Sequence, residues 1–558
     1  MEDERRDTAL VLGLDSSTQG VKALVIRADN LQVVGEWSVN YDLDLPHYAT
    51  RGGVHHFKDR VGQMDEGEVT APPLMWAEAL QLLLEKMKKA DEGTIFGRIK
   101  AVSASGQQHG SVYWRKGAEA SNLAQLLNEA QTGLPSDLMH ALKHGQGAFS
   151  VPNSPIWMDS STTPQCRRLE EAMGGPQRVA EITGSRAYER FTGNQIARVI
   201  EKQPQAYADT ERISLVSSFV ACLFVGRYAP IDRSDGSGMN LMDIRTKDWS
   251  AEALKIAAGD TSAEELADKL GNVVPSHSVV GKVAPFFRAR YGFPEDCLVI
   301  ASSGDNPNSV AGMRLGLGDV SISLGTSDTA FGILSDPKPS ASEGHIFCNP
   351  VDPDGSMAMV CYKNGSLTRQ HFRDLHAGGS WDEFNALLQT APIGNNGKTG
   401  FFFKEIEITP PGASGFFRFD ADGKTVDSFA PEVDVRAVVE GQFLSMRLHA
   451  SNIGMRQFSS ILVTGGGSSN TNICKVVADV FGVPVFKAET SNSASLGAAY
   501  RALHGWLCRQ QQVFVPFSEV LSAAAPFTKV HDPDMAAHEV YTAMLPRYEA
   551  LEKECLEH

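Results

Sequence analysis

The 558-residue chain has neither a long apolar run nor a close pair of cysteines. Its most apolar segment, residues 213–225, contains three serines and is too short to cross a bilayer. The eight cysteines are scattered without any C-x-x-C pair, which favours a reducing compartment over a disulfide scaffold. The first residues carry charges of both signs and lead into an apolar strand, so we expect neither a signal peptide nor a transit peptide. These features predict a cytoplasmic protein without a membrane span.

Positive charge is also scarce, since the net charge is −16 at pH 7. Such an acidic surface argues against nucleic acid and anionic membranes as main partners. It leaves room for an anionic ligand such as ATP, which local backbone amides and a cation can hold. At this length we expect two to four domains of an ordinary globular protein.

The common nucleotide-binding motifs are absent as well. The Gly423-Lys-Thr425 run has Arg418 where a P-loop needs its leading glycine, and no Rossmann fingerprint follows a strand with the right spacing. A nucleotide site, if there is one, must therefore be built in another way.

One stretch, residues 297–313, carries the best candidate for chemistry. Residues 297–301 are apolar and rich in β-branched side chains, which predicts a buried strand. Asn306 followed by Pro307 predicts a helix N-cap and first helical residue, so that Asp305 lies just outside a helix. The helix dipole favours the anion, and we expect Asp305 to have a low pKa. By itself this position fits either a functional carboxylate or another capping residue.

Two segments about 310 residues apart show the same predicted arrangement of a strand, a polar turn and a returning strand. Residues 9–26 contain the turn 15–20, and residues 319–334 contain the turn 325–328. Hydroxyls, backbone amides and the carboxylate of Asp15 suit a phosphate chain with Mg²⁺. Each segment alone could be an ordinary hairpin, but the pair favours a nucleotide held between duplicated domains.

Further polar groups follow other predicted strands. Gln107, Gln108 and His109 come at the end of the strand predicted over 99–106 and suit a hydroxyl-rich ligand. The glycines 465–467 precede a helix with one apolar face and let a flat ring approach the backbone, unless they only form a tight turn. The long segment 41–73 looks irregular, and Ser234–Gly238 looks like a tight turn.

These motifs together resemble the FGGY carbohydrate kinases of the actin-like ATPase superfamily, and among them most closely the eukaryotic xylulose kinases. The resemblance covers residues 10–505 and departs from many bacterial members at Ser161, where they have an arginine. The motifs that carry it are Leu14–Gly20, Gly106–Ser111, Trp157–Thr163, Thr183–Gln195, Ile231–Asn240, Gly304–Pro307, Ser323–Asp328, Gly344–Pro350 and Thr464–Gly467.

The resemblance implies an α/β protein of two actin-like (ribonuclease H-like) domains, over residues 1–300 and 301–558, with a nucleotide and sugar cleft between them. It implies transfer of the γ-phosphate of ATP, with Mg²⁺, to the 5-hydroxyl of D-xylulose. The partners would be these small molecules, and the protein would be a monomer or homodimer.

The resemblance also assigns site residues. Asp305 is the general base, and together with Asp15 it holds the metal. For the sugar the resemblance implies Gln108, His109, Arg190, Asn306 and also Asp305. For the phosphates it implies Thr18, Gly325, Thr326 and Ser327, and for the adenosine Trp381, Gly466, Gly467 and Asn470.

Three alternatives remain open at this point. The acceptor could be a related compound such as D-ribulose, glycerol or 1-deoxy-D-xylulose. The chain could instead be an actin-like or chaperone-like ATPase, although such a protein has no use for Gln108, His109 and Arg190. A binding protein without catalysis would not need both Asp15 and Asp305.

Overall fold

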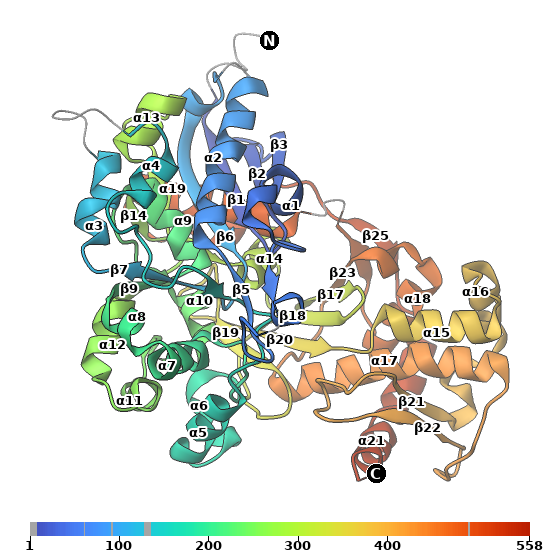
Figure 1. The fold of residues 1–558 in the computed structure, drawn as a ribbon. Helices are drawn as coiled ribbons and strands as arrows, with labels where there is room; N and C mark the ends of the chain where they lie inside the picture. Colours follow the sequence, from blue (N-terminus) through green and yellow to red (C-terminus); the bar gives the residue numbers. More distant parts are fainter. Residues whose placement is uncertain (1–7, 61, 91–92, 128–134, 489–491, 558) are drawn as a thin grey trace. The chain divides into compact units, whose positions relative to one another are not determined.

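The computed structural model describes residues 8–60, 62–90, 93–127, 135–488 and 492–557. The chain forms two compact units, and each of them is assembled from three segments (Figure 1). Unit 1 comprises residues 1–314, 347–354 and 492–524, and unit 2 comprises residues 315–346, 355–491 and 525–558.

The main sheet of unit 1 has the strand order β14-β15-β6-β1-β2-β3, with β16 also paired to β6. β1, β2 and β3 form an antiparallel meander, whereas β6 and β15 run parallel to β1. The strands of this unit are β1 (Leu10–Ser16), β2 (Gly20–Arg27), β3 (Val33–Asn40), β4 (His55–His56), β5 (Val69–Ala71), β6 (Ile99–Gly106), β7 (Ser111–Arg115), β8 (Ser154–Pro155), β9 (Thr210–Leu215), β10 (Ile231–Asp232), β11 (Met242–Asp243), β12 (Asp248–Trp249), β13 (Val273–Val274), β14 (Val279–Lys282), β15 (Leu298–Ile300) and β16 (Ser303–Gly304).

Helices cover both faces of this sheet. The alternation along β1 sends Leu10, Leu12 and Leu14 into one core with α2 and α9, and Val11 into another core with α19. The helices of unit 1 are α1 (Tyr41–Asp44), α2 (Pro73–Ala90), α3 (Ala118–Ser121), α4 (Leu138–Lys143), α5 (Thr163–Met173), α6 (Pro176–Thr183), α7 (Thr192–Lys202), α8 (Pro204–Ala208), α9 (Val216–Val225), α10 (Arg233–Gly236), α11 (Ala251–Ala258), α12 (Ala263–Leu270), α13 (Pro285–Tyr291), α14 (Asp305–Gly312), α19 (Ser493–Gln511) and α20 (Phe517–Val520).

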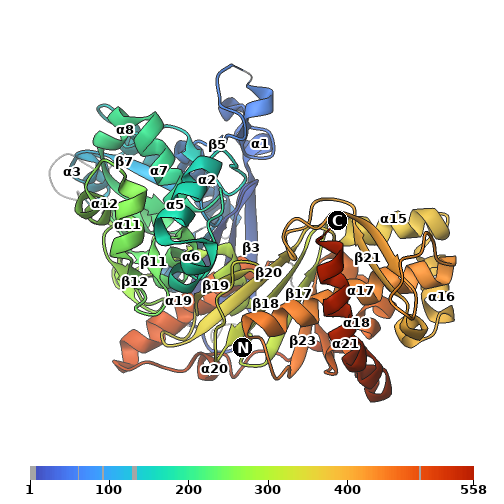
Figure 2. The same cartoon turned by 90° about the horizontal axis from the view of Figure 1, so that it is seen from below.

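The sheet of unit 2 repeats this topology in the order β19-β20-β18-β17-β23-β24-β25. β17, β18 and β20 form an antiparallel meander, and β23 and β24 run parallel to β17. The long α17 packs on β20 and β21, and α18 packs on β23 and β24 (Figure 2). The elements are β17 (Asp319–Leu324), β18 (Asp328–Leu334), β19 (His345–Cys348), β20 (Ser356–Tyr362), β21 (Thr399–Phe403), β22 (Gly415–Phe419), β23 (Ser460–Thr464), β24 (Val485–Lys487), β25 (Thr528–His531), α15 (Ser366–His376), α16 (Trp381–Thr390), α17 (Pro431–Ile453), α18 (Thr471–Phe481) and α21 (Met535–Cys555).

The repeated hairpins predicted from the sequence are thus confirmed, as β1–β2 and β17–β18. Two local expectations were wrong. Helix α14 begins at Asp305 with Gly304 as its N-cap, so Asn306 lies in the first turn and does not cap. Residues 233–239 form two short helical turns, α10 and a following 3-10 turn, and not a tight turn. In the part of the chain that the structure describes, no helix is long and apolar enough to cross a membrane.

Helix α19 approaches β1 and α14 so closely that only glycine fits at the contacts. A Cβ on Gly13 would lie 2.1 Å from the carbonyl oxygen of Ser495, and one on Gly497 would lie 1.7 Å from that of Asn308. These backbone contacts hold α14, and with it Asp305, against the sheet. They explain why residues 492–524 belong to unit 1, although they come late in the sequence.

We predict that Gly497→Ala lowers the free energy of unfolding of unit 1 by about 1–3 kcal/mol, the usual cost of overpacking. The matched control is Gly97→Ala, where the new Cβ meets no atom closer than 3.9 Å. Denaturant titration followed by circular dichroism measures both variants. Equal midpoints for the two variants would contradict the prediction.

Candidate active site

Asp305 lies at the first turn of α14, directly after the short strand β16. Its Oδ1 accepts the backbone N–H of Asn306 at 2.8 Å, and its carboxylate also accepts the backbone N–H of Gln108. The Nδ2 of Asn306 donates to the Oε1 of Gln108 at 2.5 Å. These contacts join the start of α14 to the loop after β6, and the carboxylate is fixed there by backbone groups.

The low pKa expected for Asp305 is wrong. Burial of the carboxyl, with repulsion from Asp15, raises the pKa of Asp305 to about 7, although the backbone N–H donors oppose the shift. The residue as a whole remains half-buried. Loss of hydration therefore outweighs the helix dipole at this position. A carboxylate with such a pKa is matched to proton transfer near neutral pH.

Asp15 is the penultimate residue of β1 and is buried, with 8% of its surface exposed. The register of the sheet pairs Asp15 with Ser105 of β6, and Ser105 in turn with Ser303 of β16. Burial raises the pKa of Asp15 as well, and its Oδ1 has no hydrogen-bond partner among the described residues. An unpartnered buried oxygen beside a second, repelling carboxylate suits a divalent cation with hard oxygen ligands.

Within the described ranges, however, no group of three or more His, Cys, Asp or Glu residues is arranged to hold a metal ion. Asp15 and Asp305 supply two carboxylates, which fits Mg²⁺ better than a metal that needs a full protein cage. Mg²⁺ usually keeps several waters and binds through one or two carboxylates together with substrate phosphates.

His109 is held in the left-handed backbone region, at φ 68°. A residue other than glycine rarely adopts this conformation without support from its surroundings. Here the hydroxyl of Thr192 donates to its carbonyl at 2.9 Å, and its ring stacks on Phe191 at 4.5 Å. Burial, and then the charge of Arg190, lower the pKa of His109 to about 3, so the imidazole is neutral.

The tautomer of His109 follows from its neighbour. Nδ1 lies 3.0 Å from the carbonyl oxygen of Gly238, which can only accept, so Nδ1 carries the proton. The Nε2 of His109 is then an acceptor. Arg190 lies close by and places its guanidinium 5.0 Å from the ring centre of Tyr188. All six residues predicted for the sugar and metal side, Asp15, Gln108, His109, Arg190, Asp305 and Asn306, belong to unit 1.

The first polar turn and the segment 41–73 form one wall of a pocket of about 720 Å³ in unit 1. Gly53 comes so near the turn that a Cβ there would lie 2.0 Å from the carbonyl oxygen of Thr18. The indole N–H of Trp157 donates to the Oγ1 of Thr18 at 2.8 Å. The segment 41–73 is therefore built of short elements that pack on the turn, and it is not the unstructured loop that the sequence suggested.

Unit 2 contains a second pocket, of about 660 Å³, a size typical of small-molecule sites. Six residues predicted for the nucleotide line it, namely Gly325, Thr326, Trp381, Gly466, Gly467 and Asn470. Ser327 is not among its lining residues. Further lining residues that the sequence did not single out are Ser366, Arg369, Gln370, Asp382, Asn385 and Ser469.

The glycines 465–467 explain the backbone shape of the loop that lines this pocket. Gly465 has φ 77°, and a Cβ there would lie 2.8 Å from the carbonyl oxygen of Leu324. A Cβ on Gly466 would meet nothing within 4 Å, so this part of the backbone is open. Asn470 caps α18 by accepting the N–H groups of Asn472 and Ile473. The loop thus presents bare backbone next to a helix N-terminus, an arrangement that suits a nucleotide.

Sequence reasoning missed Asp235, which lies in α10 next to Gly304. Its Oδ2 accepts the hydroxyl of Ser217 at 2.5 Å, and its Oδ1 would lie 2.7 Å from a Cβ on Gly304. Burial, then repulsion from Asp232 and Asp305, raise the pKa of Asp235 to about 8. The only signal in the sequence was its place in a motif that we interpreted as a turn.

Asp159, in the motif that departs from bacterial relatives, is saturated by protein donors. Its carboxylate accepts from the backbone of Val69, from Gln195 and from both the backbone and the hydroxyl of Ser161. Ser161 therefore binds a carboxylate within the protein.

Comparison with protein families gives two adjacent matches. Residues 150–312 match the N-terminal domain of the FGGY family of carbohydrate kinases, and residues 320–506 match its C-terminal domain. The chain is 50% identical to the xylulose kinase of Rattus norvegicus over 555 residues, which is 99% of this chain and 98% of that protein. It is 46% identical to xylulose kinase 2 of Arabidopsis thaliana over 536 residues, covering 94% and 92% of the two chains.

Solved structures share the fold at lower identity. The xylulose kinase from Bifidobacterium adolescentis has a TM-score of 0.72 at 23% identity, with 96% of this chain and 99% of that chain covered. The glycerol kinase of Plasmodium falciparum, solved with ADP, has a TM-score of 0.72 at 14% identity and 98% coverage of both chains. The two-domain actin-like fold of the sugar kinases is thereby confirmed. Because the two family matches together span more than half of the chain, and relatives at 50% and 46% identity cover 99% and 94% of it, the chain belongs to the FGGY family of carbohydrate kinases.

Proposed function

We propose that this protein transfers the γ-phosphate of ATP to the 5-hydroxyl of D-xylulose, with Asp305 as the general base. The observation that carries the proposal is the grouping of Asp305 with Asn306, His109 and Arg190 in unit 1, since it combines one base with several hydrogen-bonding groups for a polyol. The relatives named xylulose kinase support D-xylulose as the acceptor. The eight free cysteines fit a reducing compartment, and we place the reaction in the cytoplasm.

In this proposal each sugar-side group has a separate task. Asp305 accepts the proton of the attacking hydroxyl, and a pKa near 7 keeps it largely ionised at slightly alkaline pH. The Nε2 of neutral His109 accepts a hydrogen bond from a second hydroxyl. Arg190 clamps hydroxyl oxygens with several donors, because a neutral sugar offers no charge to pair. Phosphoryl transfer depends mainly on such positioning and on charge stabilisation.

On the nucleotide side, we propose that the pocket of unit 2 takes the adenosine, with Trp381, Gly466, Gly467 and Asn470 around it. Gly325, Thr326 and Ser327 hold the phosphates from one hairpin and Thr18 from the other. Asp15 and Asp305 would hold Mg²⁺, whose charge neutralises the phosphate oxygens.

The decisive test measures ADP release in a coupled assay over a panel of acceptors. We expect kcat/KM for D-xylulose to exceed that for D-ribulose and glycerol, because relatives that cover nearly the whole chain are named xylulose kinases. 1-Deoxy-D-xylulose should serve as a side substrate, since its 5-hydroxyl end is the same. A higher kcat/KM for D-ribulose or glycerol would reassign the acceptor.

We predict that Asp305→Asn reduces kcat to less than a tenth of the wild-type value. A general base typically contributes about 10²–10⁴-fold, and the isosteric amide cannot take up the proton. Sugar binding should change less, because the amide keeps the size and the hydrogen-bonding oxygen of the carboxylate. Calorimetric titration with D-xylulose checks binding, and a variant retaining more than a tenth of kcat would remove Asp305 from the base role.

We also predict an acid limb in the pH profile of kcat/KM, measured with both substrates far below saturation so that it reports the free enzyme. Because the ionised form of Asp305 is active and its pKa is about 7, activity should fall as pH decreases through 7, to about a tenth of the plateau at pH 6. In Asp15→Asn the repulsion is removed, so the limb should move to lower pH. A limb that stays in place in this variant would contradict the proposed coupling.

A further inference from the structure

A fully buried ion pair lies directly behind the second polar turn. Arg369 and Asp328 are 1% and 0% exposed, and they face each other as a two-pronged pair. The Nη1 of Arg369 donates to Asp328 Oδ2 at 2.7 Å, and its Nη2 donates to Asp328 Oδ1 at 3.1 Å. Such a pair has a fixed geometry as well as a charge interaction.

The remaining N–H groups of the two terminal nitrogens of Arg369 also donate to acceptors inside the protein. Nη1 donates to the Oε1 of Gln442 at 2.7 Å, and Nη2 donates to the hydroxyl of Ser366 at 3.1 Å. The N–H groups of both terminal nitrogens are thus used by protein acceptors, although Arg369 lines the nucleotide pocket. Its hydrogen bonds hold protein groups in place and leave none of these donors for a phosphate.

Asp328 in turn holds the turn from within. Its carboxylate accepts the backbone N–H of Gly325, the first residue of the turn. Gly365 packs against the same carboxylate, since a Cβ there would lie 2.6 Å from Asp328 Oδ1 and 2.8 Å from the carbonyl oxygen of Thr326. The N–H of Ser366 donates to the carbonyl of Gly325 at 2.9 Å. The turn is therefore fixed by one carboxylate and by the segment that follows β20.

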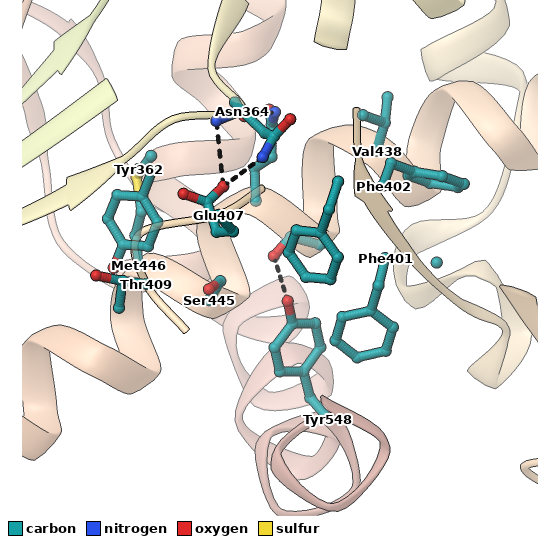
Figure 3. A pocket seen from close by; sticks show the side chains of 14 residues that line it. Tyr362, Asn364, Phe401, Phe402, Glu407, Thr409, Val438, Ser445, Met446 and Tyr548 are labelled. Carbon is teal, nitrogen blue, oxygen red and sulfur yellow. Dashed lines mark hydrogen bonds between the residues drawn. The ribbon is translucent and has the colours of Figure 1, made fainter. Parts of the chain in front are cut away.

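The segment that follows β20 is also held by hydrogen bonds with Gln442 and Glu407. The Nε2 of Gln442 donates to the carbonyl oxygens of Asn364 and Gly365 at 2.7 and 3.2 Å. Glu407 accepts the backbone N–H and the side-chain N–H of Asn364, as Figure 3 shows. The cavity drawn there, with Phe401 among its lining residues, has only about 30 Å³ of space and is too small for a sugar or a nucleotide.

We propose that Arg369 and Asp328 are positioning residues of the kinase, which hold the turn Gly325–Ser327 in the shape that binds the phosphates of the nucleotide. The proposal rests on the assignment of the nucleotide to the pocket of unit 2. Backbone amides stabilise phosphate charge only where they are already oriented, and an ion pair whose terminal N–H groups are all bonded to protein acceptors supplies this orientation. Asp328 itself is fully buried and cannot touch the ligand.

The test compares Arg369→Lys with Arg418→Lys. Arg418 makes an equivalent two-pronged pair with buried Asp434, at 2.7 and 3.1 Å, but does not line the nucleotide pocket. Lysine keeps the charge and loses the two-pronged pair in both variants, so Arg418→Lys shows what loss of such a pair in unit 2 does away from the nucleotide pocket. We expect only Arg369→Lys to raise KM for ATP, by about tenfold, and to weaken ADP binding in calorimetry without sugar, whereas KM for the sugar stays within twofold.

A second variant, Asp328→Asn, separates positioning from direct binding. If Arg369 bound phosphate itself, loss of Asp328 would free its charge and tighten ADP binding; a positioning role requires weaker binding. The proposal is overturned if Asp328→Asn binds ADP more tightly, or if Arg369→Lys matches Arg418→Lys in KM for ATP. Should Asp328→Asn fail to fold in circular dichroism, the comparison of the two lysine variants decides. If the wild-type protein binds no ADP, the assignment of the nucleotide to the pocket of unit 2 is overturned as well. If the wild-type protein and Arg369→Lys both bind ADP with the same affinity, only the positioning role of Arg369 is overturned.

Discussion

Two carboxylates that repel each other, Asp15 and Asp305, dominate the electrostatics of the candidate site in unit 1. Both are removed from water to a degree that raises their pKa values, which is unfavourable for folding at neutral pH. The arrangement persists because strong packing imposes it: the register of β1, β6 and β16 fixes the strand ends, and the glycine contacts of α19 press α14 against the sheet. The site is therefore a strained feature supported by a rigid scaffold, as expected for a site of catalysis.

The sheets of the two units have the same topology, but their polar turns differ in charge. In unit 1 the polar turn follows a strand whose last residues include Asp15, and the carboxylate keeps an unpartnered oxygen. In unit 2 Gly325 replaces this carboxylate, and the acid of the turn, Asp328, points inward and is neutralised by Arg369. The two hairpins are thus similar in topology, but the first carries a carboxylate with an unpartnered oxygen, whereas the second presents backbone amides and the hydroxyls of Thr326 and Ser327.

Much of this could be predicted from the sequence, because it depends on local patterns. Apolar runs, polar turns and the glycine triplet identify both hairpins and the loop before α18 without any knowledge of packing. The N-cap assigned to Asn306 was wrong because Gly304 already has the extended backbone that an N-cap needs, so the helix starts two residues earlier than predicted. Asp235 and Arg369 were not found, since a short helical turn and an arginine in the first turn of a helix carry no local sign of burial. Their roles arise from contacts with residues between 18 and 73 positions away.

The pKa of Asp305 shows most clearly where sequence reasoning ends and packing takes over. A helix N-terminus stabilises a nearby anion by roughly 0.3–1 kcal/mol, whereas loss of hydration can shift the pKa of a buried carboxyl by several units. The helix N-terminus can be predicted from the sequence, whereas the burial of the carboxyl cannot. The same burial makes Asp305 a stronger base than an exposed aspartate. Its proton affinity therefore depends on how tightly α14 is held against the sheet, a contact made by residues that lie almost 200 positions away in the sequence.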